Sequence, residues 1–155
     1  MTWIHVRGNP APQGSKRHVG GGRLIESSKR LPAWRIAVQD AAVQHLDPIP
    51  AGVPVRVEIH FVMPRPKSLP KSRPTPPAVK RIGDLDKLCR AILDGLDGPA
   101  YADDSQVTVL VADKRIAEPG EESGARIHVS PVEALEPPTP TQCAGKGQTP
   151  AAGPK

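Results

Sequence analysis

The sequence predicts an α/β domain of the α+β type, built from four strands and two helices. Three observations support this prediction. Apolar residues alternate with polar ones over residues 53–63, as in a strand with one buried face. They recur at helical spacing over residues 31–46 and again over residues 84–96. A length of 155 residues suits one domain, although 20 prolines and 14 glycines leave long stretches outside helices and strands.

The N-terminal region combines a strand with a basic turn segment. Residues 2–7 (TWIHVR) alternate well enough to form the first strand. Residues 8–22 (GNPAPQGSKRHVGGG) are rich in turn-forming residues, and we interpret them as a loop or ribbon. Lys16, Arg17 and His18 give this ribbon a basic tip, which suits either a DNA contact or a solvated hairpin.

The first helix is predicted over residues 31–46. Pro32 falls in the first turn, where proline is tolerated because its missing N–H would have no helical partner. Trp34 lies on the apolar stripe, so we interpret it as a core anchor rather than as a platform for stacking bases. The strand over residues 53–63 follows, and His60 lies on its polar side, where we do not expect a ligand.

A proline-rich basic segment separates this strand from the second helix. Residues 64–81 (PRPKSLPKSRPTPPAVKR) hold six prolines and six basic residues, with no acidic residue. They cannot form a helix or a central strand, so we expect an extended or disordered loop. Such a loop ahead of an acidic motif could hold phosphates on both sides of a catalytic point, although a solvated linker would have the same composition.

The second helix is predicted over residues 84–96, where leucine and isoleucine residues form one stripe. A tight turn over residues 98–105 leads into a strand over residues 106–116. Both faces of this strand begin apolar, which predicts a central position in the sheet. A last strand is predicted over residues 125–129.

The predicted domain covers residues 1–130, and residues 131–155 form a low-complexity tail that we expect to be disordered. Cys89 and Cys143 are far apart in sequence, so we expect two free thiols rather than a disulfide or a zinc site. With no signal pattern and no spanning segment, we expect a cytoplasmic protein without a membrane partner.

The chain has a formal net charge of +5 and a pI of about 9.5. A basic balance favours polyanionic partners, because each neutralised phosphate releases counterions, but a basic domain without such a partner fits equally well. The predicted core is small, so a second subunit would be a natural way to bury more apolar area.

Three aspartates are candidates for a metal site. Asp84 and Asp86 are two residues apart, about 200° on a helix, so they converge only if Asp84 precedes the helix and Asp86 lies in its first turn. Gly83 supplies backbone freedom for this bend. Asp104, with Asp103 before it, joins them if the loop after the helix returns along it, as we expect. Three carboxylates then suit Mg²⁺ or Mn²⁺ and the hydrolysis of a phosphodiester.

Spacing alone leaves a purely structural interpretation open. Aspartate is a common N-cap at the start of a helix, and Asp-Asp before a strand is an ordinary turn. Among the neighbouring residues, Arg90 lies on the same helix face as Asp86 and could brace the scissile phosphate. Asp94 could instead pair with Arg90, and Lys87 and Lys114 are weaker candidates for phosphate contacts.

The run GDLDKLCRAILDGLDGPAYADDSQV, with the N-terminal VRGNPAPQGSKR, resembles the RusA family of Holliday junction resolvases over roughly residues 2–130. The resemblance implies an α/β fold with a small mixed β-sheet flanked by the two main helices. It also implies a homodimer, Mg²⁺ dependence and paired symmetric cuts across a four-way DNA junction. The resemblance further implies a bacterial host, with the gene carried by the cell or by a phage. This sequence departs from the family's pattern in two places, the long proline-basic segment and the C-terminal tail.

Carried over by position, Asp84, Asp86 and Asp104 match the catalytic, metal-binding aspartates of the family, and Asp103 matches the acid before the last of them. Arg90 stands where the best-known member has an essential lysine, which puts a proton-transfer role in doubt. Two alternatives are a non-catalytic DNA-binding accessory protein and a nuclease for flaps or other branched DNA. The predicted DNA contacts are basic residues in or near these segments: Lys16, Arg17, Lys67, Lys71, Arg73, Lys80, Arg81 and Lys87.

Overall fold

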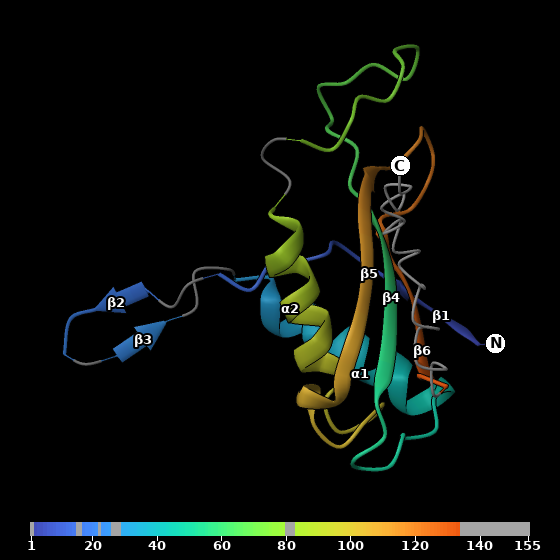
Figure 1. Cartoon of the computed structure of the whole chain (residues 1–155). Helices are drawn as coiled ribbons and strands as arrows, with labels where there is room; N and C mark the ends of the chain where they lie inside the picture. Colours follow the sequence, from blue (N-terminus) through green and yellow to red (C-terminus); the bar gives the residue numbers. More distant parts are fainter. Residues whose placement is uncertain (1, 15–16, 22, 26–28, 80–82, 134–155) are drawn as a thin grey trace, which may run out of the picture.

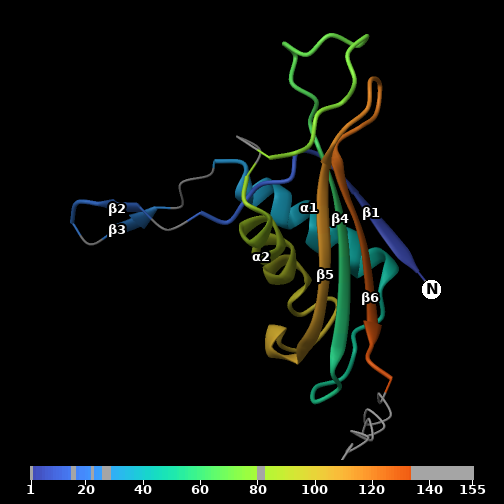
Figure 2. The same cartoon turned by 45° about the horizontal axis from the view of Figure 1, so that its top comes forward.

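A computed structural model describes residues 2–14, 17–21, 23–25, 29–79 and 83–133. Its elements are, in chain order, β1 (Trp3–Arg7), β2 (Arg17–Val19), β3 (Arg23–Ile25), α1 (Leu31–His45), β4 (Val55–Met63), α2 (Leu85–Leu96), the short 3-10 helix η1 (Asp104–Gln106), β5 (Val107–Ile116) and β6 (Gly124–Pro131). Figures 1 and 2 show α1 and α2 on the same face of the main sheet. The α+β fold and its two helices are therefore as predicted.

The main sheet is mixed and has the strand order β1-β6-β4-β5. β4 and β5 are parallel, while β6 pairs antiparallel with both β4 and β1. A parallel pair needs a crossover connection, and α2 lies within the one between β4 and β5. Because of this crossover, α2 and β5 run in opposite directions.

The predicted central position of β5 is wrong, because β5 is an edge strand of the sheet. Its side chains are more exposed than those of β4, which alternate between buried and half-buried. Leu110 and Val111, near its middle, remain 45% and 37% exposed. The apolar pattern indicated burial correctly for β4, but the sheet ends at β5 and leaves these side chains without cover in the described part of the chain.

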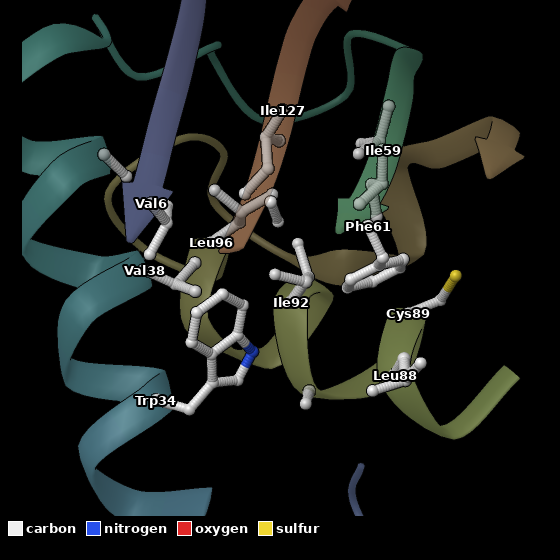
Figure 3. Packing of buried hydrophobic residues seen from close by; sticks show 14 of the residues in the cluster. Val6, Trp34, Val38, Ile59, Phe61, Leu88, Cys89, Ile92, Leu96 and Ile127 are labelled. Carbon is white, nitrogen blue, oxygen red and sulfur yellow. The ribbon is translucent and has the colours of Figure 1, made fainter. Parts of the chain in front are cut away.

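The core lies between the sheet and the two helices. The residues of β4 that face the helices, such as Ile59 and Phe61, are fully buried. They pack with Leu88 and Ile92 of α2 (Figure 3). Trp34 of α1 is 3% exposed and belongs to the same cluster, which confirms its prediction as a core anchor.

The expected basic ribbon is a small hairpin of β2 and β3 that projects from the body of the domain (Figures 1 and 2). Arg17 begins β2, whereas Lys16 lies outside the described residues, as do Lys80 and Arg81. The expected tail is likewise outside them from residue 134 onward. Neither of the two described helices has the length and apolar character that crossing a bilayer requires.

The described part of the proline-rich segment, residues 64–79, forms neither helix nor regular strand, as predicted, and hydrogen bonds from Arg65 hold its backbone in place. The Arg65 guanidinium donates to the Thr75 hydroxyl at 2.8 Å and to the carbonyl oxygens of Pro70 and Arg73 at 3.0 Å. Thr75 in turn donates to Glu118 at 2.7 Å. Prolines remove donors and leave carbonyls without partners, so one arginine with five donors can organise such a loop.

Candidate active site

The start of α2 presents two carboxylates to solvent. Asp84 occupies the N-cap position with extended backbone angles, yet its side chain makes no capping hydrogen bond. It is 71% exposed and pairs at 3.2 Å with Lys87, itself 44% exposed. Asp86 lies in the first turn and is also exposed. Asp84 therefore precedes the helix and Asp86 lies in its first turn, as the spacing required, and the Asp84 side chain does not cap the helix.

Contacts from other segments hold this helix start in place. Gly83 has a φ of +91°, and an added Cβ would lie 3.4 Å from Pro12. Lys114 of β5 donates from its Nζ to the Gly83 carbonyl at 2.7 Å. The backbone N–H of Gln13 donates to the Lys87 carbonyl at 3.0 Å. The residue before Asp84 is thus fixed by the far end of β5 and by the N-terminal segment.

The turn after α2 carries the other two acidic residues, in different roles. Asp103 is the N-cap of η1 and accepts a hydrogen bond from the Ser105 N–H at 2.8 Å. Hydrogen bonds from Ser105 lower the pKa of Asp103. Asp104 begins η1 and is exposed, and its carboxylate makes no hydrogen bond or ion pair with the residues that the structure describes. The structural interpretation therefore holds for Asp103, and Asp104 keeps a free carboxylate.

Gln106 was not singled out from the sequence, but it organises this turn. It is a buried polar residue, and its side-chain oxygen accepts from the N–H groups of Ala102 at 2.9 Å and Asp103 at 3.0 Å. Its side-chain nitrogen donates to the carbonyls of Pro50 at 2.8 Å and Val53 at 3.0 Å. The signal available in the sequence was its spacing, three residues after Asp103, which completes a capping box.

The structure does not bring Asp104 to Asp84 and Asp86 within one chain, which corrects the expected return of the loop. Asp84 and Asp86 are at the start of α2 and Asp104 follows its end, and 12 helical residues span about 18 Å. In the described ranges, no three histidine, cysteine or acidic side chains are close enough to hold a metal ion. The physical reason is the crossover: the chain turns at the end of α2, and only the far end of β5 returns to the level of Gly83.

Acidic residues accumulate at the end of α2. Burial and three neighbouring carboxylates, with Asp104 first among them, raise the pKa of Asp97. Burial and some of the same acids raise the pKa of the Tyr101 phenol. The C-terminal end of a helix adds a partial negative charge. This end of α2 is therefore a region of negative potential that favours a cation.

Arg90 is exposed on α2, between the two acidic groups. The expected pair of Arg90 with Asp94 is not formed, because Asp94 pairs with Arg35 of α1 at 3.1 Å.

The basic residues Lys67, Lys71 and Arg73 are exposed in the proline-rich segment. A pocket of about 560 Å³, walled largely by prolines, opens between this segment, the N-terminal segment and Gly83.

In a comparison with protein-family models, residues 7–130 match the model described as endodeoxyribonuclease RusA. This range includes both ends of α2 and covers most of the chain. Among curated proteins, the comparison finds no similar sequence.

Proposed function

The chain belongs to the RusA family of endodeoxyribonucleases, which resolve Holliday junctions, and we propose that it cuts four-way DNA in a Mg²⁺-dependent reaction with paired symmetric nicks. The observation that carries the proposal is the pair of exposed carboxylates at the start of α2, where Asp84 takes an N-cap position without capping. The side-chain oxygen of an N-cap aspartate normally accepts a hydrogen bond from a backbone N–H in the first turn of the helix. A carboxylate that makes no such bond is available to a ligand.

The donor set fits a hard divalent cation. Asp84, Asp86 and Asp104 offer carboxylate oxygens, the ligands that Mg²⁺ and Mn²⁺ take. When bound, such a cation polarises a phosphate oxygen and makes its water more acidic. We assign Asp103 to holding the turn, in place of the metal role that its position in the motif had indicated. Arg90 and Lys87 are assigned to the phosphates beside the scissile bond, where a guanidinium can bind but cannot act as a base.

A two-fold dimer would complete the site. Mg²⁺ binds oxygen at about 2.0–2.1 Å, so carboxylates beyond opposite ends of a helix about 18 Å long cannot share one ion. In a symmetric pair of chains with antiparallel α2 helices, the start of one helix lies beside the end of the other. Asp84 and Asp86 of one protomer would then meet Asp104 of its partner. Each dimer would have two equivalent sites, as two symmetric cuts require.

The exposed edge of β5 supports this arrangement. An edge strand has unpaired backbone groups along its outer side, which can pair with another strand. β5 is ten residues long and has Leu110 and Val111 exposed near its middle. Antiparallel pairing of two β5 strands about this point would set the start of one, next to Asp104, beside the end of the other. That end carries Lys114, which contacts Gly83 next to Asp84.

Co-expression of two inactive chains tests the shared site. Asp84→Asn and Asp104→Asn are each expected to abolish cleavage, but their heterodimer keeps one intact site. A random mixture would therefore have about a quarter of the wild-type sites and would cut one strand per junction. The matched control is Asp84→Asn with Asp86→Asn, which leaves no intact site. If the first mixture is as inactive as the control, the sites do not form across the dimer.

The activity itself is tested with a synthetic four-way junction, first with Mg²⁺ or Mn²⁺ and then with EDTA. Binding without metal-dependent cutting would identify a DNA-binding accessory protein, and faster cutting of flaps would identify a nuclease for other branched DNA.

We assign phosphate contacts to exposed Lys67, Lys71 and Arg73. We also propose Lys16, Arg17, Lys80 and Arg81, whose side chains the structure does not describe. The proposed catalytic unit is residues 1–130, acting in the bacterial cytoplasm, and the tail 131–155 has no assigned part in cleavage.

A further inference from the structure

Gln106 joins two segments around the turn that carries Asp104. Its side-chain oxygen accepts from two consecutive N–H groups in the turn, those of Ala102 and Asp103. Its side-chain nitrogen donates to two carbonyls in the loop before β4, those of Pro50 and Val53. The side chain is buried, and these four hydrogen bonds use both of its donors and both lone pairs of its acceptor.

The position of Asp104 depends on these four bonds. Asp104 directly follows Asp103, whose backbone N–H Gln106 holds, and its own carboxylate makes no contact with the described chain that would fix its orientation. A ligand on a short 3-10 turn can move unless other groups fix the backbone on each side of it. Gln106 fixes that backbone on the N-terminal side of Asp104 and anchors it to the loop at Pro50 and Val53.

We propose that Gln106 is a positioning residue of the metal site: it sets the direction in which the Asp104 carboxylate points, without touching the metal or the DNA. The proposal rests on the assignment of Asp104 as a metal ligand. Groups that hold metal ligands in place typically change metal affinity by 10-fold to 100-fold when they are replaced. If Asp104 serves the partner's site, the effect of Gln106 also belongs to that site.

Gln106→Met tests the proposal, because methionine has a similar length and no amide. The expected result is a 10-fold to 100-fold weaker binding of Mn²⁺, measured without DNA by the loss of the free-ion electron paramagnetic resonance signal. The matched control is Tyr101→Phe, which removes a hydrogen bond from the same region to the Leu93 carbonyl at 2.9 Å and touches neither Asp103 nor Asp104. This control is expected to lower the melting temperature and leave Mn²⁺ affinity unchanged.

Two outcomes of this measurement would overturn the proposal. In the first, Gln106→Met binds Mn²⁺ as tightly as the wild type. In the second, Tyr101→Phe weakens Mn²⁺ binding as much as Gln106→Met does at an equal loss of melting temperature. The second result would mean that Gln106 acts only through overall stability.

Heterodimers provide a readout that a general loss of stability would not change. In the mixture of Asp84→Asn and Asp104→Asn chains, the intact site takes its Asp104 from the Asp84→Asn chain. Gln106→Met added to that chain is expected to abolish the restored cleavage. Added to the Asp104→Asn chain, it is expected to have little effect. Equal loss in both cases contradicts a positioning role. If the mixture without Gln106→Met is inactive, the shared site is wrong, and Mn²⁺ binding by the single variant still decides the role of Gln106.

Discussion

The two aspartates at N-cap positions, Asp84 of α2 and Asp103 of η1, both have backbone angles in the extended region, but their side chains behave in opposite ways. Asp103 accepts a hydrogen bond from Ser105 and closes a capping box with Gln106. Asp84 makes no capping bond and leaves its carboxylate in solvent. The difference teaches that an N-cap position does not define a role. What matters is whether the side-chain oxygen is used by the helix that follows.

The two regions also differ in how they are held. The turn around Asp103 is organised from within by Gln106, through four hydrogen bonds. The start of α2 is held from outside, by the contact of Lys114 with the Gly83 carbonyl and by the backbone contact between Gln13 and Lys87. In both regions one carboxylate remains exposed to solvent: Asp104 in the first, and in the second Asp84, which pairs with the half-exposed Lys87. The start of α2 is held by fewer hydrogen bonds than the turn around Asp103.

The largest expected effect comes from replacing the aspartate that does not cap. Asp84→Asn removes a proposed metal ligand, and metal catalysis contributes several kcal/mol, so cleavage should fall by about 10³-fold or more. No capping bond is lost, and the exposed pair with Lys87 is weak, so the free energy of unfolding should change by less than about 1 kcal/mol. Single-turnover cleavage and thermal unfolding measure the two quantities. A large loss of stability would mean that Asp84 serves the helix after all.

A smaller effect is expected from the contact that holds the start of α2. Lys114→Met keeps most of the apolar stem and removes the ammonium that donates to the Gly83 carbonyl. Mn²⁺ affinity should fall by about 10-fold. Unfolding should become easier by about 1 kcal/mol, the usual net contribution of one hydrogen bond.

Lys114→Arg is the control for this prediction, because it keeps a donor and the positive charge and should recover part of the affinity. Equal Mn²⁺ binding by the wild type and Lys114→Met would show that the backbone contacts alone hold Asp84 in place.

The smallest effect on cleavage is expected at the aspartate that caps. Asp103→Ala removes the bond from Ser105, so the melting temperature should fall by a few degrees while cleavage stays within about 10-fold of the wild type. Hydrogen bonds from Ser105 lower the pKa of Asp103, so this stabilisation is present above the ordinary aspartate pKa and is lost as pH falls through the lowered one.

The melting temperatures of the wild type and Asp103→Ala should therefore converge in acid. A difference that persists well below pH of about 3.9, the ordinary aspartate value, would contradict this assignment. If Asp103→Ala loses as much cleavage as Asp84→Asn does, Asp103 is a metal ligand.

The sequence predicted the helices and β4 well, because their apolar periodicity reflects burial against a single core. It also predicted the arrangement of Asp84 and Asp86, since only one placement lets residues two apart converge. The edge position of β5 could not be predicted in this way. An apolar face indicates that a strand is buried, but it does not show which part of this chain or of another chain buries it. Leu110 and Val111 have no cover in the described part of one chain.

Contacts between distant segments account for the other differences. The path of the proline-rich segment depends on Arg65 and on Thr75 reaching Glu118, 43 residues away in the sequence. The separation of Asp104 from Asp84 was within reach of the sequence, because the predicted helix length already set the two apart. The return of the loop was assumed instead. Gln106 also had a signal, its spacing from Asp103, but its contacts with Pro50 and Val53 arise only in the folded chain.

In the proposed dimer, the length of α2 would set the distance between the two active sites. The first end of this helix would belong to one site and the turn after its second end to the other, so the two cutting points would lie roughly one helix length apart. Twelve residues give about 18 Å, close to five nucleotide steps along a strand. Adding or removing one helical turn would change the spacing between the two cuts by about 5.4 Å, and an enzyme altered in this way would still nick but would no longer cut in register.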